Sequence, residues 1–128
     1  MNIAALSEEF STGKVLLFNK PLYWTSFDLV NKVKHILRHK LNLKKLKIGH
    51  AGTLDPLATG LMLLCTGKET RNIDKYQEQP KEYVARIRLG ETTPSFDLET
   101  DVDASWPVDH IRKQDVEEVL AGFTGVQL

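Results

Sequence analysis

A lone carboxylate in a glycine-rich stretch is the strongest sign of chemistry in this sequence. Residues 49–60 read GHAGTLDPLATG and contain three glycines, one proline, one histidine and the acid Asp55. Pro56 restricts its own φ angle and the residue before it, so Asp55 should lie on a stiff turn. A carboxylate held in this way can act as a base or a nucleophile. Equally, Asp55 could only hydrogen-bond the backbone and set the turn, and His50 could be an ordinary turn residue.

Other candidate sites are weaker. Gly67 and Lys68 suggest a phosphate-binding P-loop, but Met62 stands where that pattern requires glycine, and Glu69 replaces the required Ser or Thr. The four histidines do not cluster with acids or cysteine at metal-ligand spacing, so no metal is expected. The single cysteine, Cys65, excludes an intramolecular disulfide and is interpreted as a buried structural thiol.

Length and composition are those of one soluble globular domain. The chain has 128 residues, of which 41% are hydrophobic and 27% charged. No apolar run approaches the roughly 20 residues that a membrane span needs, and the N-terminus lacks the pattern of a signal peptide. We therefore expect a cytosolic protein without a membrane partner.

Charge is distributed unevenly along the chain, although the net charge is zero. Residues 1–55 carry nine Lys/Arg against four Asp/Glu, and residues 56–128 carry eight against thirteen. No acid occurs between Asp28 and Asp55, whereas seven cations do: Lys32, Lys34, Arg38, Lys40, Lys44, Lys45 and Lys47. Such a cluster favours an anionic partner, with nucleic acid as the leading candidate.

Hydrophobic spacing predicts the elements that position these residues. Thr25 precedes Asp28 by three residues, as in a capping box, and apolar residues recur at helical spacing from Ser26 to about Leu41. Residues 61–65, LMLLC, do not alternate, which predicts a strand buried on both faces. The other predicted elements are a mobile polar leader (1–13), strands at 14–18, 46–48 and 81–89, a short helix at 68–77, a loop with one short strand at 90–107, and a helix at 112–122. We expect an α+β domain over residues 14–128, without an internal boundary.

Four blocks of the sequence match one known family in order. Residues 49–60 closely resemble the catalytic motif of the bacterial TruB family of tRNA pseudouridine synthases. The other blocks are Lys20-Pro21 with Thr25-Ser26, similar to K-P-x-G-x-T-S; Lys81-x-Tyr83 with Leu89-Gly90, Thr93 and Asp97, similar to K-x-Y…L-G…T-x-x-x-D; and Phe123-Thr124-Gly125, similar to the start of F-x-G-x-x-x-Q-x-P-P. One departure is Trp24, within Leu22-Tyr23-Trp24, where many relatives have glycine.

The resemblance implies a fold and a reaction. The fold would be the pseudouridine synthase catalytic domain, a mixed and largely antiparallel sheet flanked by helices, of which residues 14–128 form the N-terminal part. The reaction would be that of a tRNA pseudouridine-55 synthase, which isomerises a T-loop uridine without a cofactor or metal. The partner would be the T-stem-loop of tRNA, bound by a monomer. Aspartate attack on the sugar carbon and removal of a neighbouring sugar proton both remain open as routes.

The resemblance also assigns roles to residues. Asp55 matches the essential aspartate, Tyr83 the tyrosine that stacks on the flipped base, and His50 a histidine that contacts the RNA and assists flipping. The alternation of residues 81–89 places Tyr83 on an apolar face, where it would by default be core and could equally line a pocket. Lys20, Gly52 and Thr53 are further expected substrate-binding residues. The expected contacts to the RNA backbone are Lys32, Lys34, Arg38, Lys44, Lys45 and Lys47.

Family members are considerably longer than this chain. The later strand whose arginine pairs with the catalytic aspartate, and the C-terminal RNA-binding region, lie outside the 128 residues, so we expect this fragment to be inactive alone. Two alternatives remain: a non-catalytic RNA-binding module, and a sister pseudouridine synthase that acts on rRNA or with guide RNA. The retained Asp55 disfavours the first, and the run of residues 55–60 disfavours the second.

Overall fold

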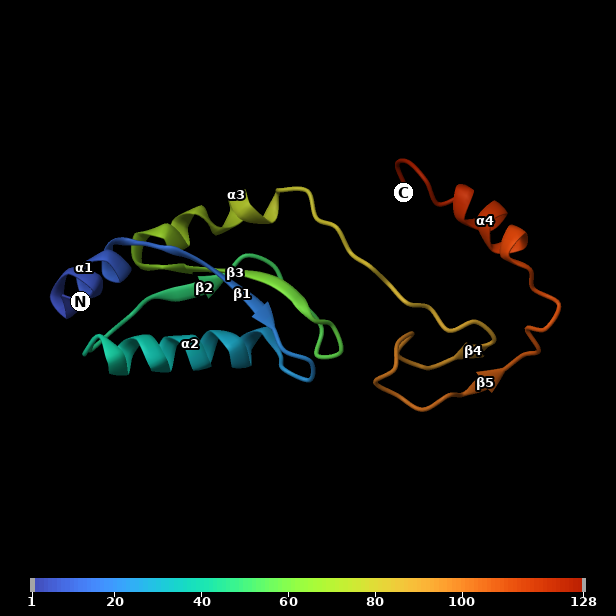
Figure 1. Ribbon diagram of the computed structural model, residues 1–128, viewed down its shortest axis with the longest axis horizontal. Coiled ribbons are helices and arrows are strands. Elements are labelled where there is room, and N and C mark those ends of the chain that lie inside the picture. Colours follow the sequence, from blue (N-terminus) through green and yellow to red (C-terminus); the bar gives the residue numbers. More distant parts are fainter. Residues whose placement is uncertain (1, 128) are drawn as a thin grey trace. The chain divides into compact units, whose positions relative to one another are not determined.

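The computed structural model describes residues 2–127, so Met1 and Leu128 lie outside the described residues. The chain divides into two compact units, with the boundary between Glu82 and Tyr83 (Figure 1). We had predicted no boundary within residues 14–128. The elements are helices and small antiparallel sheets, which confirms the predicted α+β class.

A three-stranded antiparallel sheet forms the centre of the first unit. Its strands are β1 (Val15–Lys20), β2 (Ile48–His50) and β3 (Gly60–Thr66), in the order β1-β3-β2. Lys20 lies opposite Gly60, and Val15 opposite Cys65. The strands predicted at 14–18 and 61–65 are confirmed, and the one predicted at 46–48 lies two residues later. Both ends of the glycine-rich turn are therefore anchored in neighbouring strands.

Helix α2 (Ser26–Lys40) covers one face of this sheet (Figure 1). The capping box is present: Thr25 Oγ1 accepts from Asp28 N at 3.0 Å, and Asp28 Oδ2 accepts from Thr25 N at 2.9 Å. The core consists of Leu29, Val30, Val33, Met62 and Leu64. The helix predicted from Ser26 is thus confirmed, because both its cap and its apolar spacing are local features.

The opposite face of the sheet is covered only in part. Cys65 is fully buried, but Leu61 is 63% exposed and Leu17 is exposed beside it. Leu61 lies opposite Asn19 and Leu17 opposite Leu63, so these side chains share the face away from α2. The prediction that residues 61–65 are buried on both faces is therefore wrong at Leu61, since no described element packs over that end.

Helix α1 (Ile3–Thr12) replaces the mobile polar leader that we predicted. Asn2 Oδ1 caps the helix by accepting from Ala4 N at 3.1 Å. Ser7 Oγ donates to Leu41 O at 2.8 Å, which ties α1 to the end of α2. The prediction failed because the leader is ordered by contacts with residues distant in sequence.

A short helical segment follows β3. It consists of a 3-10 helix, η1 (Gly67–Asn72), and helix α3 (Ile73–Gln77), which confirms the helix predicted at 68–77. Glu69 joins the two, because its Oε1 accepts from Asn72 Nδ2 at 3.0 Å and from the Tyr76 hydroxyl at 2.7 Å. These hydrogen bonds, led by that of Tyr76, lower the pKa of Glu69.

The second unit contains little regular structure. Strands β4 (Glu91–Thr92) and β5 (Ala104–Ser105) pair antiparallel, where we predicted a single short strand. Asp97 orders the loop between them: its Oδ1 accepts from Ser95 Oγ at 2.6 Å and from Glu99 N at 2.9 Å. Those two hydrogen bonds, that of Ser95 first, lower the pKa of Asp97.

The strand predicted at residues 81–89 is wrong. Residues 81–88 have no regular structure, and among residues 2–127 no strand pairs with them. Tyr83 is 68% exposed, and Val84, on the other side of the alternation, is exposed as well. The physical reason is that alternation makes a segment suitable for a sheet, whereas a strand forms only when a partner satisfies its backbone groups.

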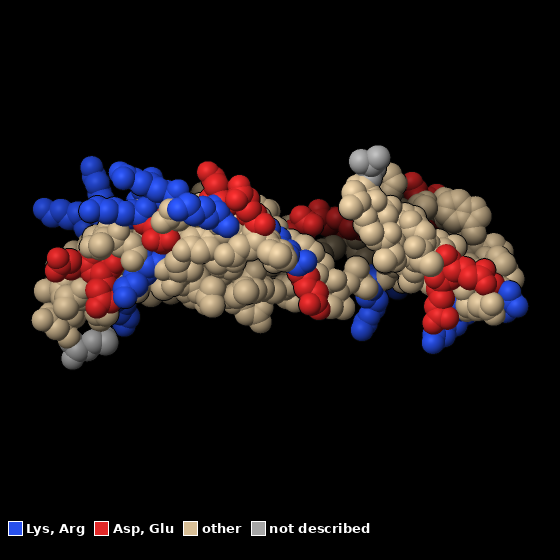
Figure 2. All heavy atoms as spheres, turned by 90° about the horizontal axis from the view of Figure 1, so that it is seen from above, with Lys and Arg blue, Asp and Glu red and all other residues tan. Residues whose placement is uncertain are grey.

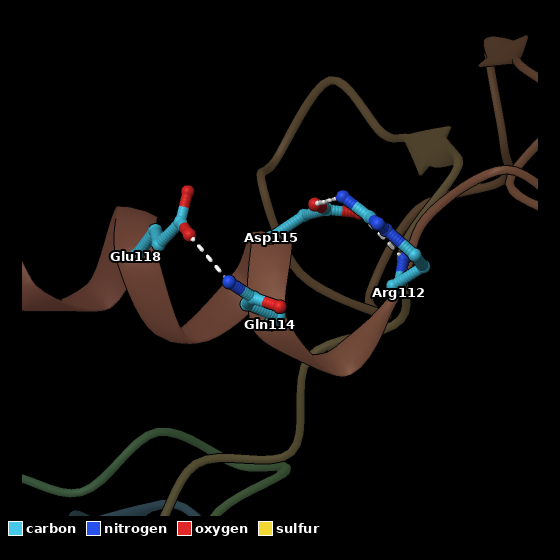
Figure 3. A network of polar contacts seen from close by, with 4 residues as sticks. All are labelled: Arg112, Gln114, Asp115 and Glu118. Carbon is cyan, nitrogen blue, oxygen red and sulfur yellow. Dashed lines mark hydrogen bonds and ion pairs between the residues drawn. The ribbon is translucent and has the colours of Figure 1, made fainter.

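Helix α4 (Lys113–Ala121) is the last helix among the described residues and confirms the helix predicted at 112–122. Figure 3 shows how it begins: Asp115 accepts from Arg112 N at 2.8 Å and from Arg112 Nη2 at 2.7 Å. The guanidinium can only donate, so the carboxylate is the acceptor that fixes the first turn. One turn later, Gln114 Nε2 donates to Glu118 Oε1 at 3.0 Å.

Candidate active site

Asp55 lies in the connection between β2 and β3, at the end of the sheet where Gly60 begins β3. Its backbone carbonyl accepts from Ala58 N at 3.0 Å, which closes a turn over Pro56 and Leu57. The residue is exposed, and among residues 2–127 no hydrogen bond or ion pair engages its carboxylate. The turn therefore presents two free carboxylate oxygens to solvent, as a base or nucleophile requires.

Ser26, in the first turn of α2, ties this connection to the helix. Its side chain is buried, and its Oγ accepts from Leu54 N at 3.0 Å and donates to Leu54 O at 3.1 Å. The Leu54 side chain packs against the core between α2 and the sheet. The residue before Asp55 is thus held by both its backbone and its side chain.

Lys20 ties the other side of the turn. Its Nζ donates to Trp24 O at 2.6 Å, to Pro21 O at 3.0 Å and to Pro56 O at 3.4 Å. Tyr23 N also donates to Pro56 O, at 2.8 Å. We expected Lys20 to bind substrate, but its side chain is fully buried. Lys20 positions the two connections it joins, because a buried ammonium needs hydrogen-bond acceptors and finds them there. Substrate binding by Lys20 stays a prediction.

Tyr23 has a backbone conformation that corrects our reading of the first motif. Counted from Lys20, the glycine of K-P-x-G-x-T-S falls on Tyr23 rather than on Trp24. Tyr23 has φ = 65°, in the left-handed region that favours glycine. Tyr23 N donates to Pro56 O in this conformation. Because tyrosine stands where the motif has glycine, a residue with a strained backbone lies beside the Asp55 turn.

The other predicted residues of the motif lie on the same connection. His50 ends β2, and its Nδ1 lies 2.6 Å from Gly52 O. Because a carbonyl only accepts, Nδ1 must carry the proton of this bond, which leaves Nε2 for another partner. Thr53 is exposed, and Gly52 has φ = 104° with open space where a Cβ would stand. The backbone thus places all three within a few residues of Asp55.

Tyr83 belongs to the second unit and lies on the extended, unpaired segment. Its ring is exposed rather than packed in a core, in contrast to the expectation from alternation. Its stacking role remains a prediction.

The basic segment, residues 32–47, spans most of α2 and the loop after it. Lys32 and Arg38 are exposed on α2, and Lys34 is half-buried there. Arg38 is partly engaged, because its Nη2 donates to Lys44 O at 2.8 Å and so fixes the start of the loop. The remaining three predicted cations, Lys44, Lys45 and Lys47, are exposed on that loop. Figure 2 shows Lys and Arg side chains gathered over the end of the first unit that carries α1, with acids beside them.

Cys65 is buried in β3, as predicted. Burial, with a smaller contribution from Glu69, raises the pKa of its thiol, which keeps it protonated and unreactive. Among residues 2–127, no group of His, Cys, Asp or Glu is placed to hold a metal ion, and no helix is long and apolar enough to cross a membrane.

Sequence reasoning missed two roles at this site and one cluster of charges at the other end of the sheet. The Ser26 hydroxyl and the Lys20 ammonium were read only as parts of a motif, because nothing local shows that they bond residues 54 and 56. The closeness of Lys68 and Arg71 to the basic loop was also missed, since more than 20 positions separate them from Lys47. The only signal available for the roles of Lys20 and Ser26 was the presence of Lys20-Pro21 and Thr25-Ser26 before the glycine-rich stretch.

Comparison with known proteins identifies the family. Residues 38–128 match the model of the TruB family pseudouridylate synthase (N terminal domain). The tRNA pseudouridine synthase B of Parabacteroides distasonis is 61% identical over 117 residues, which is 91% of this chain and 50% of that protein. The proteins of the same name from Phocaeicola vulgatus and Flavobacterium johnsoniae are 56% and 54% identical, over 91% and 92% of this chain and 49% and 52% of their own lengths. The chain thus spans about half the length of these curated relatives. It belongs to the TruB family of pseudouridylate synthases.

Proposed function

We propose that this protein isomerises a uridine in the T-loop of tRNA to pseudouridine, with Asp55 as the catalytic carboxylate. The observation that carries the proposal is the exposed Asp55, whose neighbours Leu54 and Pro56 are bound by Ser26 and Lys20. A relative that is 61% identical over 91% of this chain is named tRNA pseudouridine synthase B.

The reaction breaks the bond between the uracil ring nitrogen and the ribose, rotates the base, and joins a ring carbon to the same sugar carbon. A carboxylate serves either as the nucleophile at that sugar carbon or as the base that removes a neighbouring sugar proton. Both routes need an ionised acid on a rigid support, because the detached uracil must be rejoined in a fixed geometry. The two tethers of the turn supply that support. The target that the family resemblance implies is position 55 of tRNA.

Other residues extend this proposal. The base must leave its stack to react, and Tyr83 is proposed to hold it by stacking. His50, Gly52 and Thr53 lie beside Asp55 on one connection and are proposed to contact the displaced nucleotide. The exposed lysines of the basic segment are proposed to bind phosphates of the T-stem-loop, which predicts salt-dependent affinity. Residues 14–128 would then be the N-terminal part of a monomeric catalytic unit.

The test measures tritium release from tRNA labelled at the uracil carbon that exchanges. The protein assayed is the one isolated from its source cell, at the length at which it occurs there. Asp55→Asn should abolish turnover and change tRNA affinity by less than about threefold, since the substitution removes the reacting oxygen but little contact area. Asp74→Asn, which neutralises an exposed acid of α3, is the matched control and should retain full turnover. Substantial turnover by Asp55→Asn would refute the assignment of Asp55.

The 128 residues alone are proposed to release little tritium in the same assay. Their Asp55 has no cationic partner among residues 2–127, and an unpaired carboxylate lacks both positioning and charge stabilisation in the reaction. Turnover close to that of a full-length relative would contradict this proposal.

A further inference from the structure

A basic hollow lies at the opposite end of the sheet from Asp55. Its volume is about 270 Å³, and it is lined by Ser11, Lys45, Leu46, Lys47, Gly67, Lys68 and Arg71. Four of these seven residues are cations, and none is an acid. The cations come from two separate segments, the loop before β2 and the 3-10 helix η1, with the end of α1 as a third wall.

Backbone contacts hold the walls of this hollow together. Gly67 N donates to Lys47 O at 2.9 Å, which joins η1 to the loop before β2. Gly67 has φ = 53°, and a Cβ placed on it would lie 2.1 Å from Ser11 O, so the end of α1 rests directly on this glycine. Leu46 is buried beneath. The cations are therefore carried by a fixed backbone rather than by a free loop.

The positive charge of the hollow is not internally neutralised. Of the ion pairs among residues 2–127, none involves Lys45, Lys47, Lys68 or Arg71. The neighbouring acid, Glu69, directs its Oε1 to Tyr76 and Asn72 instead. Four exposed cations in one hollow repel one another, and an anion placed among them would relieve that repulsion.

The position of the hollow sets which part of a ligand could reach it. Strand β3 runs from Gly60, next to the Asp55 turn, to Thr66, next to the hollow. Six residue steps of about 3.3 Å separate the two sites by roughly 20 Å. A group bound here would lie several nucleotides away from a uridine that reacts at Asp55.

We propose that this hollow binds a backbone phosphate of the RNA substrate, at a point remote from the reacting uridine. The proposal rests on the proposed function for the identity of the RNA. Arg71 can bind a phosphate through two parallel N–H donors, and the three lysines add point charges. Two of the cations, Lys68 and Arg71, lie outside the basic segment, so the contact would extend RNA binding onto η1.

The test compares two double variants of the full 128-residue chain in binding to unmodified tRNA across a salt series. Lys68→Gln with Arg71→Gln removes two cations from the hollow. Lys75→Gln with Arg86→Gln removes one lysine and one arginine that are exposed, do not line the hollow and lie outside the basic segment, and it serves as the charge-matched control. The hollow variant should bind about 10-fold more weakly and lower the slope of log Kd against log salt by about one, as expected for one lost phosphate contact. The control should keep the slope of the unsubstituted chain.

A second arm separates a phosphate of the RNA from free phosphate. Inorganic phosphate is titrated against the chain while the Gly67 amide is followed by NMR, with and without bound tRNA. Bound tRNA should suppress the response of Gly67 to inorganic phosphate. Equal salt slopes for the two double variants, no tRNA binding at all, or an unchanged phosphate response in the presence of tRNA would each overturn the proposal. Failure of the proposed function is recognised separately, by turnover of Asp55→Asn.

Discussion

The Ser26 hydroxyl should determine how firmly the Asp55 turn is held. Ser26 is only 4% exposed, and its Oγ makes both of its hydrogen bonds with the backbone of Leu54, at 3.0 and 3.1 Å. Ser26→Ala removes both and leaves an N–H and a C=O of a half-buried residue without these partners. At about 0.5–1.5 kcal/mol for each hydrogen bond, the free energy of unfolding should fall by about 1–3 kcal/mol.

The assay is urea unfolding of the first unit, followed by tryptophan fluorescence. The chain has two tryptophans, and a Trp106→Phe background leaves Trp24, which packs against the core of the first unit, as the single reporter. With a slope of about 1–3 kcal/mol per molar urea, a 2 kcal/mol loss moves the midpoint by about 1 M. Hydrogen exchange of the Leu54 amide should accelerate in parallel, because its acceptor is lost.

The control for this substitution is Ser105→Ala, in the exposed strand β5. It changes the same atoms without touching the turn and should leave both measurements unchanged. If Ser26→Ala shifted the midpoint no more than Ser105→Ala did, and Leu54 exchanged at its original rate, the argument that Ser26 holds the turn would be refuted.

Three further predictions concern the start of α2 and the packing of α1 against Gly67. Thr25→Ala should lower stability by about 1 kcal/mol by removing the cap, measured by the same unfolding assay. The hydrogen bonds from Thr25 lower the pKa of Asp28. The contribution of Asp28 to stability is therefore present above its unfolded pKa of about 4 and is lost as the pH falls through the lower folded value. The difference in the free energy of unfolding between the original chain and Asp28→Asn should shrink in acid and persist at pH 7. Gly67→Ala should destabilise the first unit by more than about 3 kcal/mol and speed amide exchange in α1, because the new Cβ meets Ser11 O. Gly52→Ala, also at positive φ but in open space, should cost only about 1–2 kcal/mol, and equal losses for the two glycines would contradict the packing argument.

Much of the first unit could be predicted from local pattern. The capping box of Thr25 and Asp28, the apolar stripe of α2 and the apolar runs of β1 and β3 are features of neighbouring residues, and each produced the expected element. The turn around Asp55 was found in the same way, because glycine and proline act on the backbone where they stand. These interactions span only a few positions and need no knowledge of the rest of the chain.

Elements that depend on distant partners were predicted less well. Residues 81–89 alternate, yet they pair with no strand among the described residues. Helix α1 looked like a mobile leader, because its hydrogen bond to Leu41 and its contact with Gly67 join residues far apart in sequence. Leu61 sits in an apolar run, but whether it is covered depends on which element packs over that face.

The sequence by itself determined the family and the α+β class, and it singled out the acid that we propose as catalytic, since all of these are carried by residue identity and spacing. Tertiary structure decided how that acid is held. It placed Ser26 and Lys20 against the backbone on either side of Asp55, and it brought Lys68 and Arg71 beside Lys45 and Lys47. Sequence records which groups are available, whereas the closing of a sheet and the docking of helices decide which of them meet. Hydrogen bonds and charges act over a few ångströms of space, whatever their separation along the chain.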